Sequence, residues 1–342
     1  MANYTTINKS GDYFNTKLYT GNGGTQSITG VGFQSDFTWI KRRDAGNNHR
    51  WTDAVRGVEK EIYSDGNWSE DTRTNGLTAF SADGFTIGNS SGYNGSGGTF
   101  ASWNWKANGA GSSNTDGATN TTVSVNTTAG FSIVKWTGTG NATTLGHGLN
   151  AVPKFWIIKN LEQAEDWRIY HHSLGNTKKL ELNNNEAEAS DISYWNNTSP
   201  TSSLMTVGSS NANNGGSRNM IAYCFAEKTG YSKFGSYVGN GNADGAFVYT
   251  GFKPAFVMVK EYGQTGNWLM WDNTTPNWNR AYKMANEPDA ENTADNVSID
   301  LLSNGFKFRG TAGDSNGSGN NIIYMAFGQS LVGSNNVPCT AR

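Results

Sequence analysis

The chain has 342 residues and a net charge of −2, with 26 Lys and Arg against 28 Asp and Glu, and only 16% of its residues are charged, where about 25% is typical. This balance excludes the basic surface of a nucleic-acid-binding protein, and no stretch approaches the roughly 18 continuous apolar residues of a membrane-spanning helix. The 43 glycines and 12% aromatic residues favour strands joined by tight turns.

Five landmarks recur in the same order three times along the chain. The first is an aromatic strand ending in glycine: "KLYTGNG" (17–23), "IVKWTGTG" (133–140) and "FGSYVGNG" (234–241). The second is an apolar strand ending in lysine: "GFQSDFTWIK" (32–41), "LNAVPKFWIIK" (149–159) and "GFKPAFVMVK" (251–260). A tryptophan follows each lysine after 10, 8 and 8 residues: Trp51, Trp167 and Trp268.

Two further strands complete each copy. The fourth landmark is "DGFTIG" (83–88), "SSLMTVG" (202–208) and "NGFKFR" (304–309), and the fifth is "TFASWNW" (99–105), "MIAYCF" (220–225) and "IIYMAF" (322–327). The period is 117 residues from Gly21 to Gly138 and 101 residues from Gly138 to Gly239. A repeat of this length indicates a supersecondary unit used three times.

Alternating and continuous apolar runs between Gly and Asn turns predict antiparallel strands, some of them buried on both faces. We therefore predict an all-β protein of three tandem β-sandwich (jelly-roll-like) units of about 100 residues each. The expected divisions are units at 1–106, 130–229 and 230–330, a flexible Gly/Asn/Ser/Thr-rich linker at 107–129 and a C-terminal tail at 331–342. Lys260 is expected to mark the point where its strand reaches solvent, and 286–302 to be a loop leading into a strand.

No pattern of catalytic or metal-ligating residues emerges. His171 and His172 are adjacent in a predicted strand, where they point to opposite faces, and His49 and His147 lie far away in sequence. Cys224, within "IAYCF", is predicted to be a buried free thiol. We expect no enzymatic activity and no cofactor or metal site, although oxygen-rich loops leave room for a structural divalent cation.

Glycoside hydrolysis is a candidate activity because tryptophan-rich β-sandwiches often handle sugars. That reaction needs two carboxylates on opposite sides of the scissile bond. Glu162, Glu165 and Asp166 lie within "LEQAEDW", but no matching acidic pair recurs in the other two units. Loop charge is the better interpretation of this cluster.

The aromatic residues divide into two groups. Those at equivalent strand positions are expected to pack in cores: Trp39, Trp156, Phe256, Trp103, Tyr223 and Tyr324. Less regular ones in polar loops are candidate surface contacts: Trp68, Tyr93, Trp195, Tyr262, Trp278 and Tyr282. Exposed aromatic side chains beside Asn and Ser can stack on sugar rings or anchor a protein partner.

Several segments resemble a domain family of uncharacterised function in virion proteins of marine bacteriophages. They include "GFQSDFTWIKRRDAGNNHRWTDAVRG", "DGFTIG", "ASWNWKA", "GFSIVKWTGTG", "GHGLNAVPKFWIIKN" and "YSKFGSYVGNGNADGAFVYTGFKPAFVMVK". The resemblance extends from about residue 12 to 330. That family occurs in tail fibres and similar appendages of phages infecting cyanobacteria and other marine bacteria, and it has no assigned catalytic residues.

The resemblance implies a structural protein of the virion surface, made in the host bacterial cytoplasm. The leading expectation is a tail fibre or receptor-binding appendage of a tailed phage that contacts a host surface glycan or protein. The alternatives are a capsid decoration or head-fibre protein, and a polysaccharide-binding or polysaccharide-degrading appendage. The expected partners are other virion proteins and further copies of the chain. The common symmetry of fibres suggests a homotrimer. Neither nucleic acid nor a membrane is expected as a partner.

Overall fold

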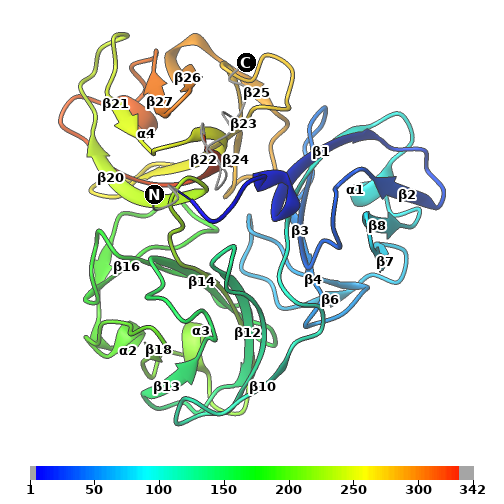
Figure 1. Cartoon of the computed structure of the whole chain (residues 1–342), viewed down its shortest axis with the longest axis vertical. Helices are drawn as coiled ribbons and strands as arrows, with labels where there is room; N and C mark the ends of the chain where they lie inside the picture. The colour runs from blue at the N-terminus through cyan, green and yellow to red at the C-terminus, as the bar shows by residue number, and fades with distance from the viewer. Residues whose placement is uncertain (1–4, 331–342) are drawn as a thin grey trace.

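The computed structural model describes residues 5–330. The predicted C-terminal tail (331–342), with Cys339, lies outside the described residues. As predicted, the fold is all-β and its named strand pairs are antiparallel. Within the described residues, no sheet combines strands of two different units. Strands β1–β9, β10–β19 and β20–β28 define the first, second and third unit, which surround a common centre as three lobes (Figure 1).

The first unit has a larger sheet, ordered β1-β9-β3-β4, and a smaller sheet, ordered β2-β8-β7. The larger sheet contains β1 (Phe14–Thr20), β9 (Thr99–Trp105), β3 (Phe37–Arg42) and β4 (Arg50–Asp53). The smaller contains β2 (Gln26–Thr29), β8 (Gly84–Ile87) and β7 (Leu77–Ser81). The short elements are η1 (Ser10–Asp12), β5 (Lys60–Glu61), β6 (Asp71–Thr72) and α1 (Ser91–Asn94).

The second unit has the larger sheet β10-β11-β12-β19-β14-β15 and the smaller sheet β13-β18. The larger contains β10 (Ser112–Asn114), β11 (Thr121–Asn126), β12 (Phe131–Thr137), β19 (Asn219–Phe225), β14 (Phe155–Asn160) and β15 (Arg168–His171). The others are β13 (Thr143–Gly146), β18 (Leu204–Val207), β16 (Lys178–Lys179), β17 (Ala189–Ser190), α2 (Ile192–Trp195) and α3 (Asn211–Asn214).

The third unit has the larger sheet β20-β28-β22-β23-β24-β25 and the smaller sheet β21-β27-β26. The larger contains β20 (Ser232–Val238), β28 (Asn321–Gln329), β22 (Lys253–Glu261), β23 (Trp268–Asp272), β24 (Ala281–Met284) and β25 (Asn292–Thr293). The others are β21 (Phe247–Tyr249), η2 (Asp295–Val297), β26 (Ile299–Leu302), β27 (Gly305–Phe308) and α4 (Gly313–Asn316).

The segment 107–129 is not the flexible linker that its composition predicted. Strand β11 pairs with β12, and β10 pairs with β11, so the segment extends the larger sheet of the second unit. Alternation within Thr121–Asn126 buries Val123 in the core of that unit. The polar composition reflects an exposed sheet edge, where only one face needs apolar residues.

The central strands of each larger sheet, β3, β14 and β22, are buried on both faces. In β22, Phe256 and Met258 belong to a core shared by all three units, whereas Val257 and Val259 pack against the smaller sheet of their own unit. The period of two along a strand sends successive side chains to these two cores. This arrangement explains the continuous apolar runs in the sequence.

The shared central core is aromatic. Ring centroids are 4.5 Å apart between Phe37 and Tyr223, 5.7 Å between Phe225 and Phe327, and 5.3 Å between Phe14 and Phe327. These contacts join the first unit to the second, the second to the third and the third to the first. The three units therefore close into a ring.

The strand register corrects one landmark. Trp51 lies opposite Trp39, at the position that Ile169 holds opposite Ile157 in the second unit. The tryptophan position of the other units is taken by His49, eight residues after Lys41. The backbone N–H of His49 donates a hydrogen bond to Asp65 Oδ1, just as the backbone N–H of Trp167 donates to Asn183 Oδ1. The alignment of Trp51 with Trp167 and Trp268 that spacing predicts is therefore wrong by two residues.

Candidate functional site

The lysines that end the repeated strands lie at the interfaces between units. Lys41, Lys159 and Lys260 are each fully buried, so the expectation that Lys260 reaches solvent is wrong. Each Nζ donates to a backbone carbonyl of a neighbouring unit: Lys41 to Pro288 at 3.0 Å, Lys159 to Asn67 at 3.1 Å and Lys260 to Asn185 at 3.3 Å. Burial lowers the pKa of Lys159 to about 7 and those of Lys41 and Lys260 to about 8.

The loops that receive these lysines are a sixth repeated motif, which the spacing of the sequence landmarks does not predict. They are "DGNWSE" (65–70), "NNNEAE" (183–188) and "NEPDAE" (286–291). The backbone N–H of each final glutamate donates at 2.8 Å to the neighbouring unit: Glu70 to Leu161, Glu188 to Tyr262 and Glu291 to Arg43. The signal available in the sequence was an Asn or Asp five residues before a Glu, which is too weak to detect without the structure.

Buried charged and polar side chains join the units closer to the centre. Tyr223 Oη donates to Asp53 at 2.7 Å, and Asp53 also pairs with the buried Arg56 at 2.5 Å. At the equivalent place in the third unit, Asp272 accepts from Trp103 Nε1 at 3.3 Å and from Lys283 Nζ at 3.2 Å. The bond from Tyr223 to Asp53 joins the second unit to the first, and the bond from Trp103 to Asp272 joins the first unit to the third. Both buried carboxylates have a cationic partner within their own unit, as buried charges require.

In the second unit, His171 occupies the position that Asp53 and Asp272 hold in the other two units. This buried histidine predicts that the stability of the fold is sensitive to acid. His171 Nε2 donates to Tyr324 O at 3.3 Å across the interface between the second and third units, and Nδ1 accepts from Ser173 N–H at 3.1 Å. Burial lowers the pKa of His171 to about 3, against about 6.5 in an unfolded chain. The folded state binds fewer protons between these values, so this stability is full above about pH 6.5 and is lost as pH falls.

At about pH 5 we expect His171 to cost about 2 kcal/mol of unfolding free energy relative to about pH 7. His147, with a pKa lowered by burial to about 4, acts in the same direction, whereas burial raises the pKa of Asp65 to about 6 and opposes it. Denaturant unfolding of the wild type and His171→Gln at both pH values measures the effect. Equal losses in the two proteins would contradict this assignment.

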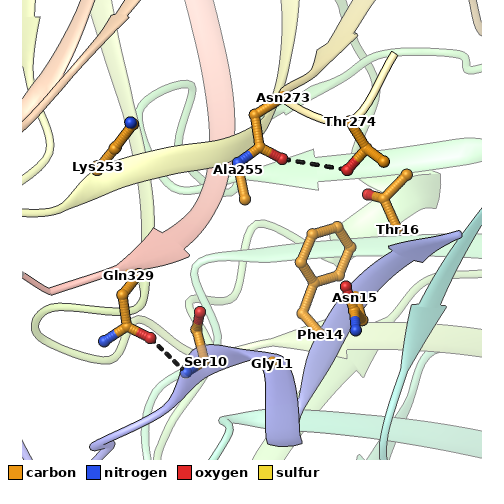
Figure 2. Close-up of a pocket in the computed structure, with 10 residues that line it drawn as sticks. All are labelled: Ser10, Gly11, Phe14, Asn15, Thr16, Lys253, Ala255, Asn273, Thr274 and Gln329. Carbon is orange, nitrogen blue, oxygen red and sulfur yellow. Dashed lines mark hydrogen bonds between the residues drawn. The ribbon is translucent and has the colours of Figure 1, made fainter. Parts of the chain in front are cut away.

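A cleft of about 370 Å³ lies at the seam between the first and third units. In Figure 2 the Phe14 ring points into it between Ser10 of η1 and the pair Asn273 and Thr274, which follows β23. Ser10 N–H donates to Gln329 Oε1 at 2.8 Å, which ties the N-terminal segment to the end of β28. The lining combines the apolar Phe14 and Ala255 with hydroxyl and amide side chains, and Lys253 is its one ionisable residue, so the cleft suits hydrogen bonding more than proton transfer.

The remaining reactive groups are dispersed. Cys224 is fully buried, as predicted, and burial raises the pKa of its thiol. Glu162 binds Asn219 and Asp166 binds Asn183 in local contacts. Within residues 5–330, no group of three or more His, Cys, Asp or Glu side chains is placed to hold a metal ion. Over the same residues, no helix has the length and apolar character needed to cross a membrane.

The six candidate contact aromatics differ in exposure. Tyr93, Trp195 and Tyr282 are buried and belong to unit cores, so their prediction as surface contacts is wrong. Tyr262 and Trp278 are half-buried against cores. Trp68 is 49% exposed, the highest value among the twelve tryptophans, all of which lie within residues 5–330.

Trp68 stands in one of the interface loops and borders a second cleft. This cleft measures about 360 Å³ and is lined by Asn48, Tyr63, Trp68, Ser69, Glu70 and Asp71. Its mixture of an exposed ring with amide, hydroxyl and carboxylate groups is typical of a binding site. We take this Trp68 cleft as the candidate functional site.

Comparison with known proteins adds a family but no activity. No curated protein matches the chain. The family model described as a domain of unknown function (DUF7483) matches residues 9–330, which include all three units. The chain therefore belongs to the DUF7483 family.

Proposed function

We propose that the chain is a non-enzymatic structural protein of the virion surface of a tailed marine phage, used as a tail fibre or receptor-binding appendage. The observation that carries the proposal is the Trp68 cleft, in which an exposed aromatic ring lies among hydrogen-bonding side chains on a ring of three units that share one core. Binding residues are commonly presented on loops positioned by a rigid scaffold. The resemblance of residues 12–330 to virion proteins of marine phages supports the same proposal.

Adsorption competition tests this function. Host cells are preincubated with the purified protein, and the adsorption rate of the phage that encodes it is then measured. We expect saturating folded protein to slow adsorption, and the same protein after thermal unfolding to have no effect. An unchanged rate at saturation would reject a role in receptor binding.

A capsid decoration or head-fibre protein is the second candidate, favoured by the threefold arrangement of the units, which could fit a local three-fold of a capsid. Cryo-EM of the virion separates the two: density at the tail supports the appendage, and density across the head lattice supports decoration. The alternative to the expected homotrimer is a monomer, because the three units of one chain already surround one centre. Light scattering distinguishes a 36.9 kDa monomer from a species of three times that mass.

A further inference from the structure

We propose that the Trp68 cleft binds a neutral pyranose unit of a surface glycan, with the Trp68 ring as its stacking platform. This inference rests on the proposed function, for which it names the ligand class. It depends on three properties of the cleft: the fixed position of the ring, the chemistry of the lining, and the absence of a structural need for tryptophan at this position.

The Trp68 ring is held in place from below. It lies directly over Gly66, where an added Cβ would meet ring atom Cζ3 at 2.1 Å. Tyr63 meets it edge-on, with ring centroids 5.6 Å apart and an interplanar angle of 89°. Gly66 O accepts from Trp167 Nε1 at 3.1 Å, so the inter-unit contact fixes the loop beneath the ring. A platform fixed before binding loses little conformational entropy when a ligand arrives.

The lining supplies hydrogen-bonding groups suited to sugar hydroxyls. Asn48 offers an amide and Ser69 a hydroxyl, and the carboxylates of Glu70 and Asp71 accept hydrogen bonds. Arg56 lies 3.2 Å from Glu70 and Arg73 lies 2.8 Å from Asp71, which leaves the carboxylates paired. None of the six lining side chains is a cation, so the cleft offers no ion-pair partner to a uronate or sulfated sugar, whereas a neutral sugar needs only the hydrogen bonds that the cleft supplies.

Tryptophan is not needed for the structural role of this loop. The equivalent loops of the other units have Glu186 and Asp289 at the position of Trp68. Those loops make the same contacts to Lys260 and Lys41 without an aromatic residue. The Trp68 side chain is therefore not needed for the contacts between the three units. Its exposed indole face is where a sugar ring can stack.

The test is fluorine NMR of protein labelled with fluorinated tryptophan, with the Trp68 resonance assigned from Trp68→Phe. Probes are cellotetraose, maltotetraose, chitotetraose and β-1,4-galactotetraose as neutral ligands, and tetragalacturonate as the acidic one, each titrated to about 20 mM because a shallow single-platform site binds weakly. We expect at least one neutral probe to shift the Trp68 resonance saturably. Trp68→Ala should weaken its binding at least about tenfold, as measured by calorimetry.

Two controls separate a binding defect from a folding defect. Trp278→Phe, at a half-buried tryptophan of the third unit, should leave the affinity unchanged, and Trp68→Ala should keep the unfolding midpoint of the wild type. The proposal is overturned if no neutral probe shifts the Trp68 resonance, if tetragalacturonate alone does, or if Trp68→Ala binds the neutral probe as tightly as the wild type.

The outcome is distinguishable from that of the proposed function. A chain located on the virion that blocks adsorption equally well as wild type and as Trp68→Ala would retain the receptor-binding role and reject the sugar site. A neutral sugar bound at Trp68 by a chain absent from the virion would retain the site and reject the virion role.

Discussion

Replacing Lys159 with methionine should lower the free energy of unfolding by about 3 kcal/mol or more. Lys159 Nζ, which has at most three N–H groups, lies within hydrogen-bonding distance of four carbonyl oxygens, those of Asn67, Asn160, Gln163 and Glu165, at 2.8 to 3.3 Å. Methionine keeps most of the buried volume but donates no hydrogen bond, so these acceptors lose their partner in a place that water does not reach. Denaturant unfolding followed by circular dichroism measures the change.

Lys135→Met is the matched control for this prediction. Lys135 lies on β12 of the same sheet and is half-exposed, so its replacement should change the unfolding free energy by no more than about 0.5 kcal/mol. If both substitutions had the same small effect, the buried lysines would not be holding the units together.

The second large effect is expected at a buried asparagine that ends each of the helices α1, α3 and α4. Asn94, Asn214 and Asn316 are fully buried, and each Nδ2 donates to carbonyls of the turns around it. Asn214 Nδ2 also donates to Thr139 Oγ1 at 3.0 Å, and its Oδ1 accepts from Thr139 N–H at 3.1 Å and Trp136 Nε1 at 3.2 Å. The asparagine thus holds the turn after β12 against the helix.

Asn214→Asp should cost about 3–5 kcal/mol of unfolding free energy. A carboxylate of the same shape cannot donate, so it would face Thr139 Oγ1 and the carbonyls of Asn141 and Gly208 as an unpaired buried charge. Asn211→Asp, at an exposed position of the same helix, should change stability by at most about 0.5 kcal/mol. Thermal and denaturant unfolding give both values, and a similar stability of the two variants would contradict this role.

The sequence predicted the fold class because glycine and aromatic landmarks recur at fixed intervals. Strand β9 begins and ends where the pattern "TFASWNW" does, at residues 99–105. The reason for the recurring glycines is visible in space: at Gly138 an added Cβ would lie 2.2 Å from Gly215 O, where the turn approaches α3. Such close approaches leave a clear signal in a sequence, since only glycine permits them.

Features that depend on the ring were not predictable. A lysine at the end of an apolar strand usually reaches water, and only a neighbouring unit at this point buries Lys260. The exposure of loop aromatics was equally ambiguous, since Tyr93 enters a core and hydrogen bonds with Thr52 at 3.2 Å, whereas Trp68 stays outside. Local composition does not reveal which loops another unit covers.

The measurement that tests the ring most directly is hydrogen exchange of the three equivalent glutamate amides, Glu70, Glu188 and Glu291. Glu70 and Glu188 lie at interfaces between units that follow one another in the chain. Glu291 lies at the interface between the third and first units, which are not consecutive in the sequence. A closed ring predicts that the Glu291 amide is protected to the same degree as the other two, because exchange then requires opening of the ring. Rapid exchange at Glu291 beside slow exchange at Glu70 and Glu188 would contradict closure and leave an open array of three units.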